Sequence, residues 1–380
     1  MARPVMGGAV AMTSEPKAAT DRRDVSRKPR IASNIVFESS LAERIDLQCI
    51  VPREGAWTER LAYWRHAMRL WKQSDIVFLE APHRELLSWC LIASLLRGFR
   101  CKLACADLNL PRPVSTRDLI VAAITRVLLQ RVDLFLLLQK DFSDYQKYYG
   151  LKPERTIHVP FKTNHLDVVN ALEPSEGDYY WSGGVTYRDW ATLAQAVEGL
   201  DVKIVITVPE DEELRRRGES DSKKRRQRGV PPIVPRKEIF GASNVRIVRH
   251  CADPRSWLNW VAGARGVILP IHPRSISPSG VSTYLTAMAL QKPLIISEGA
   301  STLGLLDETT ALIVPPGDPD ALRSTILRLD GSADLRRQLA HAGHRHALAA
   351  GDASRLHTDY LRHLLQLATR VASPTPARSS

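Results

Sequence analysis

The feature that most constrains the fold is a regular alternation of short apolar runs with longer segments of helical periodicity. The short runs lack an alternating polar face, so each predicts a strand that is buried on both sides. Parallel strands need helical crossovers between them, and the longer segments supply those crossovers. The sequence therefore predicts an α/β protein in which helices cover both faces of parallel sheets. Predicted strands occupy residues 33–38, 47–51, 76–79, 102–106, 134–138, 156–159, 179–182, 202–207, 245–248, 266–270, 293–297 and 311–314, and predicted helices 57–73, 85–96, 118–131, 141–149, 189–198, 254–262, 281–290, 319–328, 333–349 and 354–372.

The alternation occurs twice, with a polar connector around residues 172–178 between the two series. We therefore predict two Rossmann-like, doubly wound domains in tandem. A cleft between them is the expected ligand site, because open α/β sheets bind ligands at the carboxyl ends of their strands. The predicted order is a disordered basic N-terminus at 1–32, a first domain at 33–171, a second domain at 172–350, a helix at 351–372 that packs back on the first domain, and a tail at 373–380.

Composition and charge narrow the class of protein. The chain has 380 residues, of which 44% are hydrophobic, enough to fill two cores. No apolar run is long enough to span a membrane, and the basic N-terminal residues lack the apolar segment of a secretory signal. The five cysteines are odd in number and scattered, which favours reduced thiols in the cytoplasm over disulfides or a zinc site. We therefore expect a cytoplasmic protein without a metal site.

The positive charge is unevenly distributed. The formal net charge is +12, and basic residues gather at 22–30 and again at 215–228. Such segments predict an acidic neighbour, for which the inner membrane surface and nucleic acid are two candidates. The segment 215–228 contains no aromatic residue on which a base could stack, and this disfavours binding of single-stranded nucleic acid. A peripheral contact with an anionic membrane is the expectation that remains.

The most informative segment is a loop of small residues that leads directly into the predicted helix 281–290. The N-terminus of a helix leaves N–H groups unpaired and carries partial positive charge, which makes it an anion site. Gly280 would let a ligand approach the main chain, and the hydroxyls of Ser282 and Thr283 could donate to phosphate oxygens. The alternative is an ordinary capped helix, since serine is common at that position. The predicted anion-binding residues are Ser279, Gly280, Val281, Ser282 and Thr283.

The residues around this loop resemble those of family 4 glycosyltransferases. Ala287-Met288-Ala289, followed by Lys292-Pro293 and a strand, is similar to the family signature Glu-Ala-Met-Ala-x-Gly-x-Pro. Downstream, residues 311–322 resemble the closing strand and helix start of the family. Upstream, residues 180–184 resemble the first strand and glycine-rich turn of its C-terminal domain.

The resemblance is extensive over residues 179–348, looser over 75–161, and poor before Ser74, where the usual first strand and glycine-rich turn are not evident. It implies a GT-B arrangement, with an acceptor domain followed by a nucleotide-sugar domain. The implied reaction is transfer of a sugar, with retention, from a nucleotide-diphosphate donor to a polysaccharide, lipid-linked or small-molecule acceptor. Enzymes of this kind need no metal or other cofactor. A role in bacterial polysaccharide biosynthesis follows from the same resemblance.

The donor site implied by the resemblance departs from the family pattern. Pro278 and Thr286 stand where the family usually carries two glutamates, so hydroxyl groups would take the place of carboxylates. The family's diphosphate-binding cations fall near Gly183 and Arg188, and only Arg188 is a cation here. A surface ion pair is the alternative role for Arg188, and Arg274 is a second candidate cation. The implied donor site comprises Gly183, Gly184, Arg188, Arg274, Ser279, Gly280, Val281, Ser282, Thr283 and Thr286.

Asp107 is the acidic candidate in the first domain. It ends a predicted strand where the family often has His-Asp, and Ala106 replaces the histidine. Its position at the carboxyl end of a strand places it toward the cleft, where it could bind acceptor hydroxyls or act as a base. It could equally cap the turn that follows, together with Asn109. Asp107 and Arg188 are the predicted catalytic residues.

A second class of function remains open from the sequence. The absent glutamates and histidine would also fit a non-catalytic GT-B-like protein. In that alternative the basic segment 215–228 binds nucleic acid or a membrane and supplies the function.

Overall fold

The computed structural model describes residues 27–50, 65, 68–81, 90–91, 101–211, 232–235, 240 and 244–372. Four predicted segments lie wholly or almost wholly outside the described residues. They are the basic N-terminus up to residue 26, nearly all of the helix 85–96, the basic segment 215–228 and the tail 373–380. Within the ranges given, no helix combines the length and apolar character needed to cross a bilayer.

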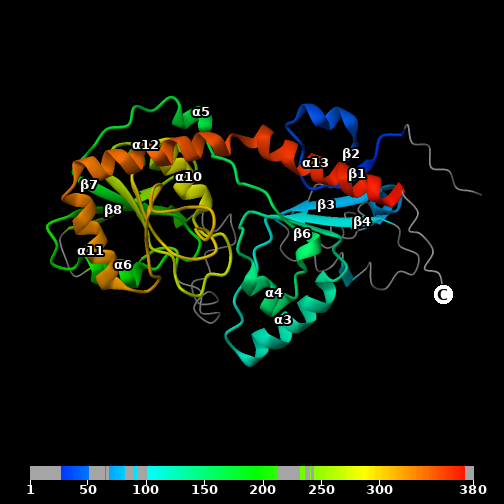
Figure 1. Ribbon diagram of the computed structural model, residues 1–380, viewed down its shortest axis with the longest axis horizontal. Coiled ribbons are helices and arrows are strands. Elements are labelled where there is room, and N and C mark those ends of the chain that lie inside the picture. The colour runs from blue at the N-terminus through cyan, green and yellow to red at the C-terminus, as the bar shows by residue number, and fades with distance from the viewer. Residues whose placement is uncertain are drawn as a thin grey trace, which may run out of the picture.

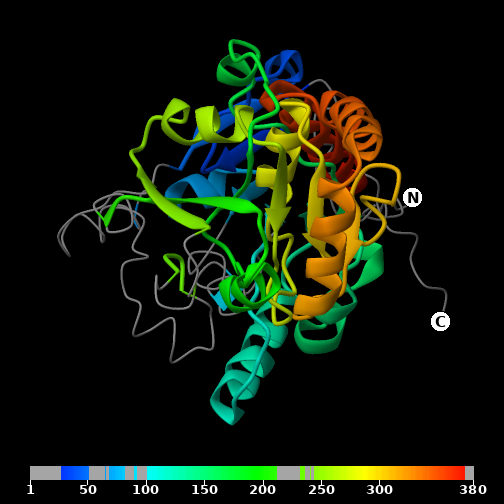
Figure 2. The same ribbon diagram turned by 90° about the vertical axis from the view of Figure 1, so that its left-hand side faces the viewer.

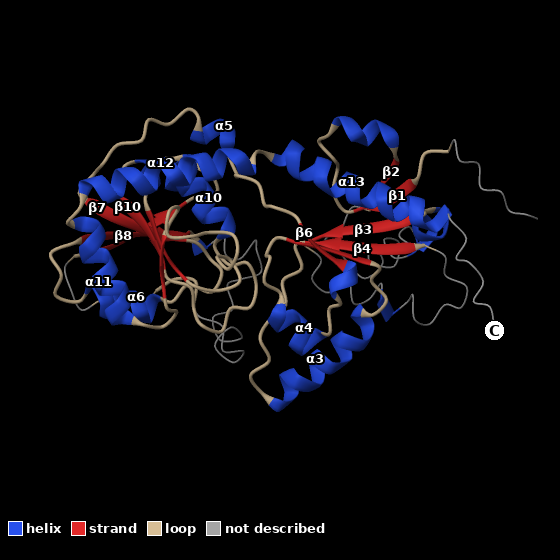
Figure 3. Cartoon of the chain, in the orientation of Figure 1, coloured by secondary structure: helices blue, strands red, loops and turns tan. Residues whose placement is uncertain are grey.

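Two six-stranded sheets form the two halves of the molecule, and Figure 3 shows helices around each of them. The strand order is β2-β1-β3-β4-β5-β6 in the first sheet and β12-β11-β10-β7-β8-β9 in the second, and all neighbouring strands are parallel. The predicted pair of doubly wound α/β domains is thereby confirmed. The strands are β1 (Arg30–Ser33), β2 (Asp46–Cys49), β3 (Ile76–Glu80), β4 (Lys102–Ala106), β5 (Leu134–Leu137), β6 (Thr156–His158), β7 (Tyr179–Gly183), β8 (Lys203–Pro209), β9 (Val245–His250), β10 (Gly266–Leu269), β11 (Leu294–Ser297) and β12 (Leu312–Val314).

Several helices begin where the sequence provides a polar cap. The side chains of Ser115, Asp189, Asp318 and Ser332 each accept a hydrogen bond from the first turn of the helix that follows. Such caps satisfy N–H groups that a helix leaves unpaired at its start. The helices are α3 (Thr116–Leu129), α4 (Ser143–Tyr149), α5 (Leu166–Val169), α6 (Trp190–Val197), α9 (Arg255–Ala262), α10 (Val281–Ala289), α11 (Pro319–Asp330), α12 (Ala333–Ala350) and α13 (Ala353–Ala372), with single 3-10 turns η1 (Ser40–Arg44) and η2 (Pro153–Arg155).

The central strands, such as β3, β5 and β10, are buried on both faces, as their apolar sequences require, whereas the edge strands β2 and β9 have no buried residue. In β3, Val77 and Leu79 join a cluster with residues of α3 and α4, whereas Ile76 and Phe78 join a cluster with residues of α13. All four side chains are fully buried. Successive residues of a strand point to opposite faces of its sheet, so one apolar run contributes to two cores.

Helix α13 packs on the first sheet. Helices α12 and α13 run end to end across both halves (Figure 1), with Gly351 between them at a φ of +68°. The buried side of α13 carries Leu356, Tyr360, Leu361 and Leu364, and the Tyr360 and Phe78 ring centroids are 5.3 Å apart. The first domain is therefore completed by residues from the end of the chain.

The N-terminal boundary differs from its prediction. Strand β1 begins at Arg30, inside the range expected to be disordered, and it pairs with both β2 and β3. Ile31 is fully buried there, and the Asp75 carboxylate accepts a hydrogen bond from the Arg30 N–H at 2.9 Å. The first strand of the domain is thus present. It was missed because its short apolar stretch directly follows a basic run.

The segment predicted as a strand at 33–38 leaves the sheet after Ser33. The side chain of Asn34 instead makes two hydrogen bonds of 2.8 Å with the backbone N–H and carbonyl of Glu80, the last residue of β3. An amide side chain offers both a donor and an acceptor, so it can pair with the backbone like another strand residue. The predicted strand therefore ends where a side chain takes over the pairing.

Candidate functional site

A cavity of about 370 Å³ lies between the carboxyl ends of the two sheets. The first domain contributes Asp107, directly after β4, and the second contributes the turn after β7, the last residues of β8 and β9, and the start of α10. Loops at these strand ends are the usual ligand site of open α/β sheets. The residues that line the cavity are Asp107, Asn109, Leu138, Phe161, Asn164, His165, Trp181, Gly184, Val185, Thr186, Arg188, Thr207, Pro209, His250, Trp257, Pro278, Ser279, Gly280, Val281, Ser282 and Thr283.

The turn after β7 brings a glycine and an arginine together. Gly184 has a φ of +100°, a conformation that side chains other than hydrogen rarely adopt. A Cβ at this position would lie 2.3 Å from the Nη2 of Arg188. Gly183, the last residue of β7, is buried and lies under the turn instead of lining the cavity. The two glycines thus let the chain fold tightly around the Arg188 guanidinium.

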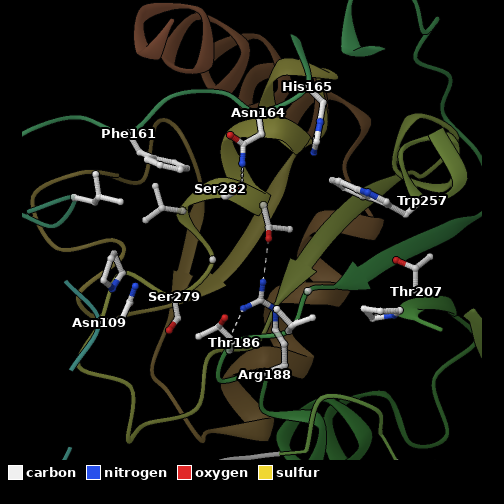
Figure 4. A pocket seen from close by; sticks show the side chains of 18 of the residues that line it. Asn109, Phe161, Asn164, His165, Thr186, Arg188, Thr207, Trp257, Ser279 and Ser282 are labelled. Carbon is white, nitrogen blue, oxygen red and sulfur yellow. Dashed lines mark hydrogen bonds between the residues drawn. The ribbon is translucent and has the colours of Figure 1, made fainter. Parts of the chain in front are cut away.

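Arg188 is buried, with only 2% of its surface exposed. Its Nε donates to the Gly183 carbonyl at 2.6 Å, its Nη1 to the Thr186 carbonyl at 2.8 Å, and its Nη2 to the Thr283 hydroxyl at 3.2 Å (Figure 4). Burial lowers the pKa of Arg188 to about 10, so the group remains charged at neutral pH. Within the described parts of the chain it has no carboxylate partner, which contradicts the surface ion pair proposed as its alternative role.

A buried cation without a carboxylate is costly unless another anion neutralises it. Among the described residues that line the cavity, Arg188 is the only arginine or lysine. The site is thus prepared for a negatively charged ligand. A planar guanidinium suits the oxygens of a phosphate, to which it can donate two parallel hydrogen bonds.

The start of α10 faces the same cavity. Its N-cap is Gly280, with a φ of +96° and no side-chain cap. The first-turn N–H groups of Ser282 and Thr283 have no partner within the described residues. The ordinary serine-capped helix, the alternative from the sequence, is therefore not what the structure contains. Free N–H groups and the helix dipole favour an anion at this point.

The residues before Gly280 form a compact hydroxyl cluster. Ser279 is buried, and its hydroxyl lies 2.7 Å from the hydroxyl of Ser275 and 3.4 Å from that of Ser277. These contacts hold the loop in place beneath the cavity. Ser279 and Val281 both line the cavity, as do the side chains of Ser282 and Thr283.

Two predicted donor-site residues lie away from the cavity. Thr286 is buried in α10, and its hydroxyl donates to the Ser282 carbonyl at 2.9 Å, so it has no free group for a ligand. Arg274 is exposed, and it does not line the cavity. Neither takes part in the site as the structure presents it.

Asp107 contributes a carboxyl group from the first domain. Burial, with a smaller contribution from the nearby Glu80 carboxylate, raises the pKa of Asp107 to about 7. Asn109 donates to its Oδ1 at 3.2 Å, so Asp107 helps to hold the turn as well as lining the cavity. Its φ of +49° is unusual for a residue with a side chain. Such strain is typical of functional positions.

Several residues of the site were not predicted from the sequence. Trp257, near the start of α9, stacks on Trp181 with ring centroids 6.0 Å apart, and His165 lies edge-on to Trp257 at 6.3 Å. All three line the cavity, and Figure 4 shows His165 and Trp257 close together on one side of it. Asn164 donates to the Ser282 hydroxyl at 2.6 Å and so links the segment between β6 and α5 to α10. The position of His250 at the end of β9 follows the strand-end rule and could have been predicted.

The loop between β10 and α10 is also attached to the first domain. Ile276 is buried in the same apolar cluster as Leu108 and Tyr145 of that domain. The Gln139 side chain donates to the Ile276 carbonyl at 3.3 Å, and the Lys140 ammonium donates to the Gly304 carbonyl at 2.7 Å. The two domains therefore meet through the loop that leads into α10.

Comparisons with known proteins agree with this architecture at the level of the fold. No protein-family model matches the sequence, and no curated protein matches it either. Among solved structures, the chain is similar to HepE from Anabaena in complex with UDP and glucose, with a TM-score of 0.61 and 11% identity over 89% of this chain and 100% of that one. It is also similar to sucrose-phosphate synthase from Thermosynechococcus elongatus, with a TM-score of 0.60 and 16% identity over 84% of this chain and 81% of that one.

A third similar structure is a glycosyltransferase from Rickettsia africae, with a TM-score of 0.55 and 12% identity over 92% of this chain and 91% of that one. At these identities the similarity concerns the path of the chain and not the site. It extends over nearly the whole length of both proteins in each comparison. The chain therefore has the two-domain GT-B fold of nucleotide-sugar glycosyltransferases.

Proposed function

We propose that the protein is a glycosyltransferase that takes a sugar from a nucleotide-diphosphate donor. The observation that carries the proposal is the pairing of a buried Arg188, which has no carboxylate partner in the described structure, with the uncapped start of α10 at Gly280. Both favour an anion in the same part of the cavity. Similar structures include a complex with UDP-glucose, which supports a donor of this class.

In this proposal the cavity holds the diphosphate, the base and the sugar of the donor in three different parts. The diphosphate lies between Arg188 and the N–H groups of Ser282 and Thr283. The base stacks beside Trp257, near His250, because an aromatic side chain is a good platform for a planar ring. The sugar then extends toward Asp107, whose carboxyl group faces the acceptor side of the cleft.

Catalysis in this proposal rests on charge stabilisation. As the bond from sugar to diphosphate breaks, negative charge grows on the leaving phosphate, where Arg188 and the α10 dipole already lie. Positioned donors of this kind need no rearrangement during the reaction. Asp107, with its raised pKa, can receive the proton of an acceptor hydroxyl at neutral pH. We also propose that the transfer retains the anomeric configuration, that it needs no metal, and that the protein acts in the cytoplasm.

The acceptor is proposed as a saccharide chain, a lipid-linked sugar or a small molecule. It would enter from the first domain, past Asp107 and Asn109.

The test is calorimetric titration of the purified protein with UDP, GDP, ADP and TDP. Arg188→Ala should weaken the preferred nucleotide at least about tenfold, because a hydrogen bond to a charged group contributes about 1.5–3 kcal/mol. Gly280→Asp should abolish binding by placing a carboxylate at the helix start. Arg274→Ala is the matched control, because it removes an exposed arginine outside the cavity and should bind like the wild type.

Thermal unfolding of each variant separates loss of the site from loss of the fold. Arg188→Lys keeps a cation and should bind more tightly than Arg188→Ala. If the folded wild type binds none of the four nucleotides, the proposal is wrong.

A further inference from the structure

Helix α3 has no polar outer face. It runs from Thr116 to Leu129 and begins with a capping box, in which Ser115 and Asp118 bond each other's backbone. Its inner side is marked by the buried Ala122, Thr125 and Leu129, which face the first sheet and α4. A surface helix normally carries polar residues opposite such a side. In α3 the opposite side is apolar as well.

The apolar outer side is well exposed. Ile120, Ile124 and Val127 are spaced so that they lie along one line of the helix, away from its buried residues. Their exposed fractions are 59%, 58% and 70%. Leu119 and Val121 flank this line and are 54% and 53% exposed. We call these five residues the outer face of α3. Figure 2 shows α3 standing out from the body of the protein, where nothing in the described structure covers it.

The charges beside the outer face are positive. Arg117 and Arg126 are exposed and lie on the two sides of the line formed by Ile120, Ile124 and Val127, and the Arg126 guanidinium also donates to the carbonyl of Lys147 in α4 at 3.5 Å. The one acidic residue of the helix, Asp118, is half-buried and engaged in the capping box. An apolar face between cations matches the surface of an anionic bilayer, which offers both acyl chains and negative headgroups.

A second copy of the chain is a poorer partner for this face. In a symmetric dimer the same patch meets itself, so the arginines of one copy would approach those of the other. The formal net charge of +12 adds to that repulsion. A bilayer with acidic headgroups instead attracts every one of these charges.

We infer that α3 docks the protein on an anionic lipid surface, with the outer face inserted among the headgroups and upper acyl chains. The contact is peripheral, because α3 lies on the protein by its buried side and presents only its outer face. The inference is independent of sugar transfer, since none of the five residues lines the cavity. A connector of residues 108–115 joins Asp107 at the cavity to the start of α3.

The experiment is flotation of the full chain with lipid vesicles in the absence of nucleotide. We expect the wild type to bind vesicles of phosphatidylcholine mixed with phosphatidylglycerol, to bind phosphatidylcholine vesicles weakly, and to be released partly by salt. The triple variant Ile120→Gln, Ile124→Gln, Val127→Gln should lower binding to the mixed vesicles about tenfold or more, because it removes the apolar insertion.

The matched control changes exposed leucines on the second domain. Leu327→Gln with Leu348→Gln removes two side chains that are 49% and 57% exposed on α11 and α12, and it should bind vesicles like the wild type. Arg117→Gln with Arg126→Gln tests the charge and should reduce the preference for phosphatidylglycerol. Circular dichroism and nucleotide titration verify that each variant is folded.

Three results would overturn the inference. The first is a wild type that does not float with mixed vesicles. The second is a folded triple variant that binds them as well as the wild type, because lipid binding would then come from another part of the chain. The third is a wild-type dimer in sedimentation equilibrium that the triple variant converts to a monomer without any change in lipid binding.

Discussion

The Nη2 of Arg188 lies 3.2 Å from the hydroxyl oxygen of Thr283, so the turn after β7 is bonded directly to the first turn of α10. The hydroxyl accepts this bond from the guanidinium, which leaves its own proton free to donate into the cavity. The two groups can therefore bind one phosphate together.

Thr283→Val should weaken binding of the preferred nucleoside diphosphate about fivefold. The variant removes one donor to the ligand, and a typical hydrogen bond contributes about 1 kcal/mol. Thr286→Val is the matched control on the same helix, since its hydroxyl is bonded within the helix. Calorimetry on both variants makes the comparison, and equal affinities would argue against a ligand contact at Thr283.

Gly184→Ala should lower the free energy of unfolding by about 2 kcal/mol or more and also weaken nucleotide binding. The new Cβ must adopt a φ of +100° and would displace the Arg188 guanidinium, 2.3 Å away. Gly199→Ala isolates the backbone effect, because its φ is +69° and no atom lies within 4 Å of the added carbon. That control should cost about 1 kcal/mol and leave binding unchanged.

Asp107→Asn should stabilise the protein increasingly as the pH rises from about 4 to about 7. Burial and Glu80 raise the pKa of Asp107 from 3.8 to about 7, so the folded state holds a proton that the unfolded state has already lost. Stability therefore falls with rising pH in this window, by on the order of 4 kcal/mol, and the amide variant avoids the loss. Denaturant titrations at several pH values measure the difference. A difference that does not vary with pH would contradict the raised pKa.

The same variant should lose sugar transfer while keeping affinity for the nucleotide. In the wild type, transfer should increase with pH with a midpoint near 7, as the Asp107 carboxyl becomes a base. Loss of nucleotide affinity together with transfer would place Asp107 in the donor site instead.

Ile276→Ala should destabilise the contact between the domains by about 2 kcal/mol or more, because it leaves a cavity in the apolar cluster of the first domain. Hydrogen exchange should increase both in the loop 271–280 and around Gln139, its partner across the interface. Ile120→Ala removes the same atoms from an exposed position and should have little effect in solution. Faster exchange confined to the loop would mean that the domains do not depend on this contact.

Removal of divalent metal should not change nucleotide affinity by more than about threefold, since Arg188 and the α10 dipole supply the positive charge. Calorimetry with EDTA and with Mg²⁺ makes the comparison. A tenfold loss in EDTA would show that the diphosphate depends on a metal ion.

Much of the fold was predictable because buried parallel strands have an unmistakable apolar sequence. β3 and β10 are examples: the four apolar residues of β3 and all residues of β10 are buried. β1 escaped prediction because only Ile31 and Ala32 are fully apolar in it, and its position in the sheet depends on pairing with residues far along the chain. Strand pairing between residues far apart in the sequence cannot be predicted from the local composition of either strand.

The site was predictable where a local rule applied. The rule for helix starts led to Gly280, and the resemblance to family 4 glycosyltransferases implied Gly184 and Arg188; all three line the cavity. The prediction that Thr286 lines the donor site is not matched by the structure, because Thr286 lies one helical turn beyond Ser282 and is buried in the core. Trp257 comes from a different element, and no local pattern connects it to the cavity.

The packing of α13 on the first sheet has a consequence for how the chain is made. During synthesis the first half leaves the ribosome early, but the face of its sheet that carries Ile31 and Phe78 stays uncovered until residues 353–372 follow. Residues 353–372, which are translated after the strands of the second domain, therefore close the core of the first domain.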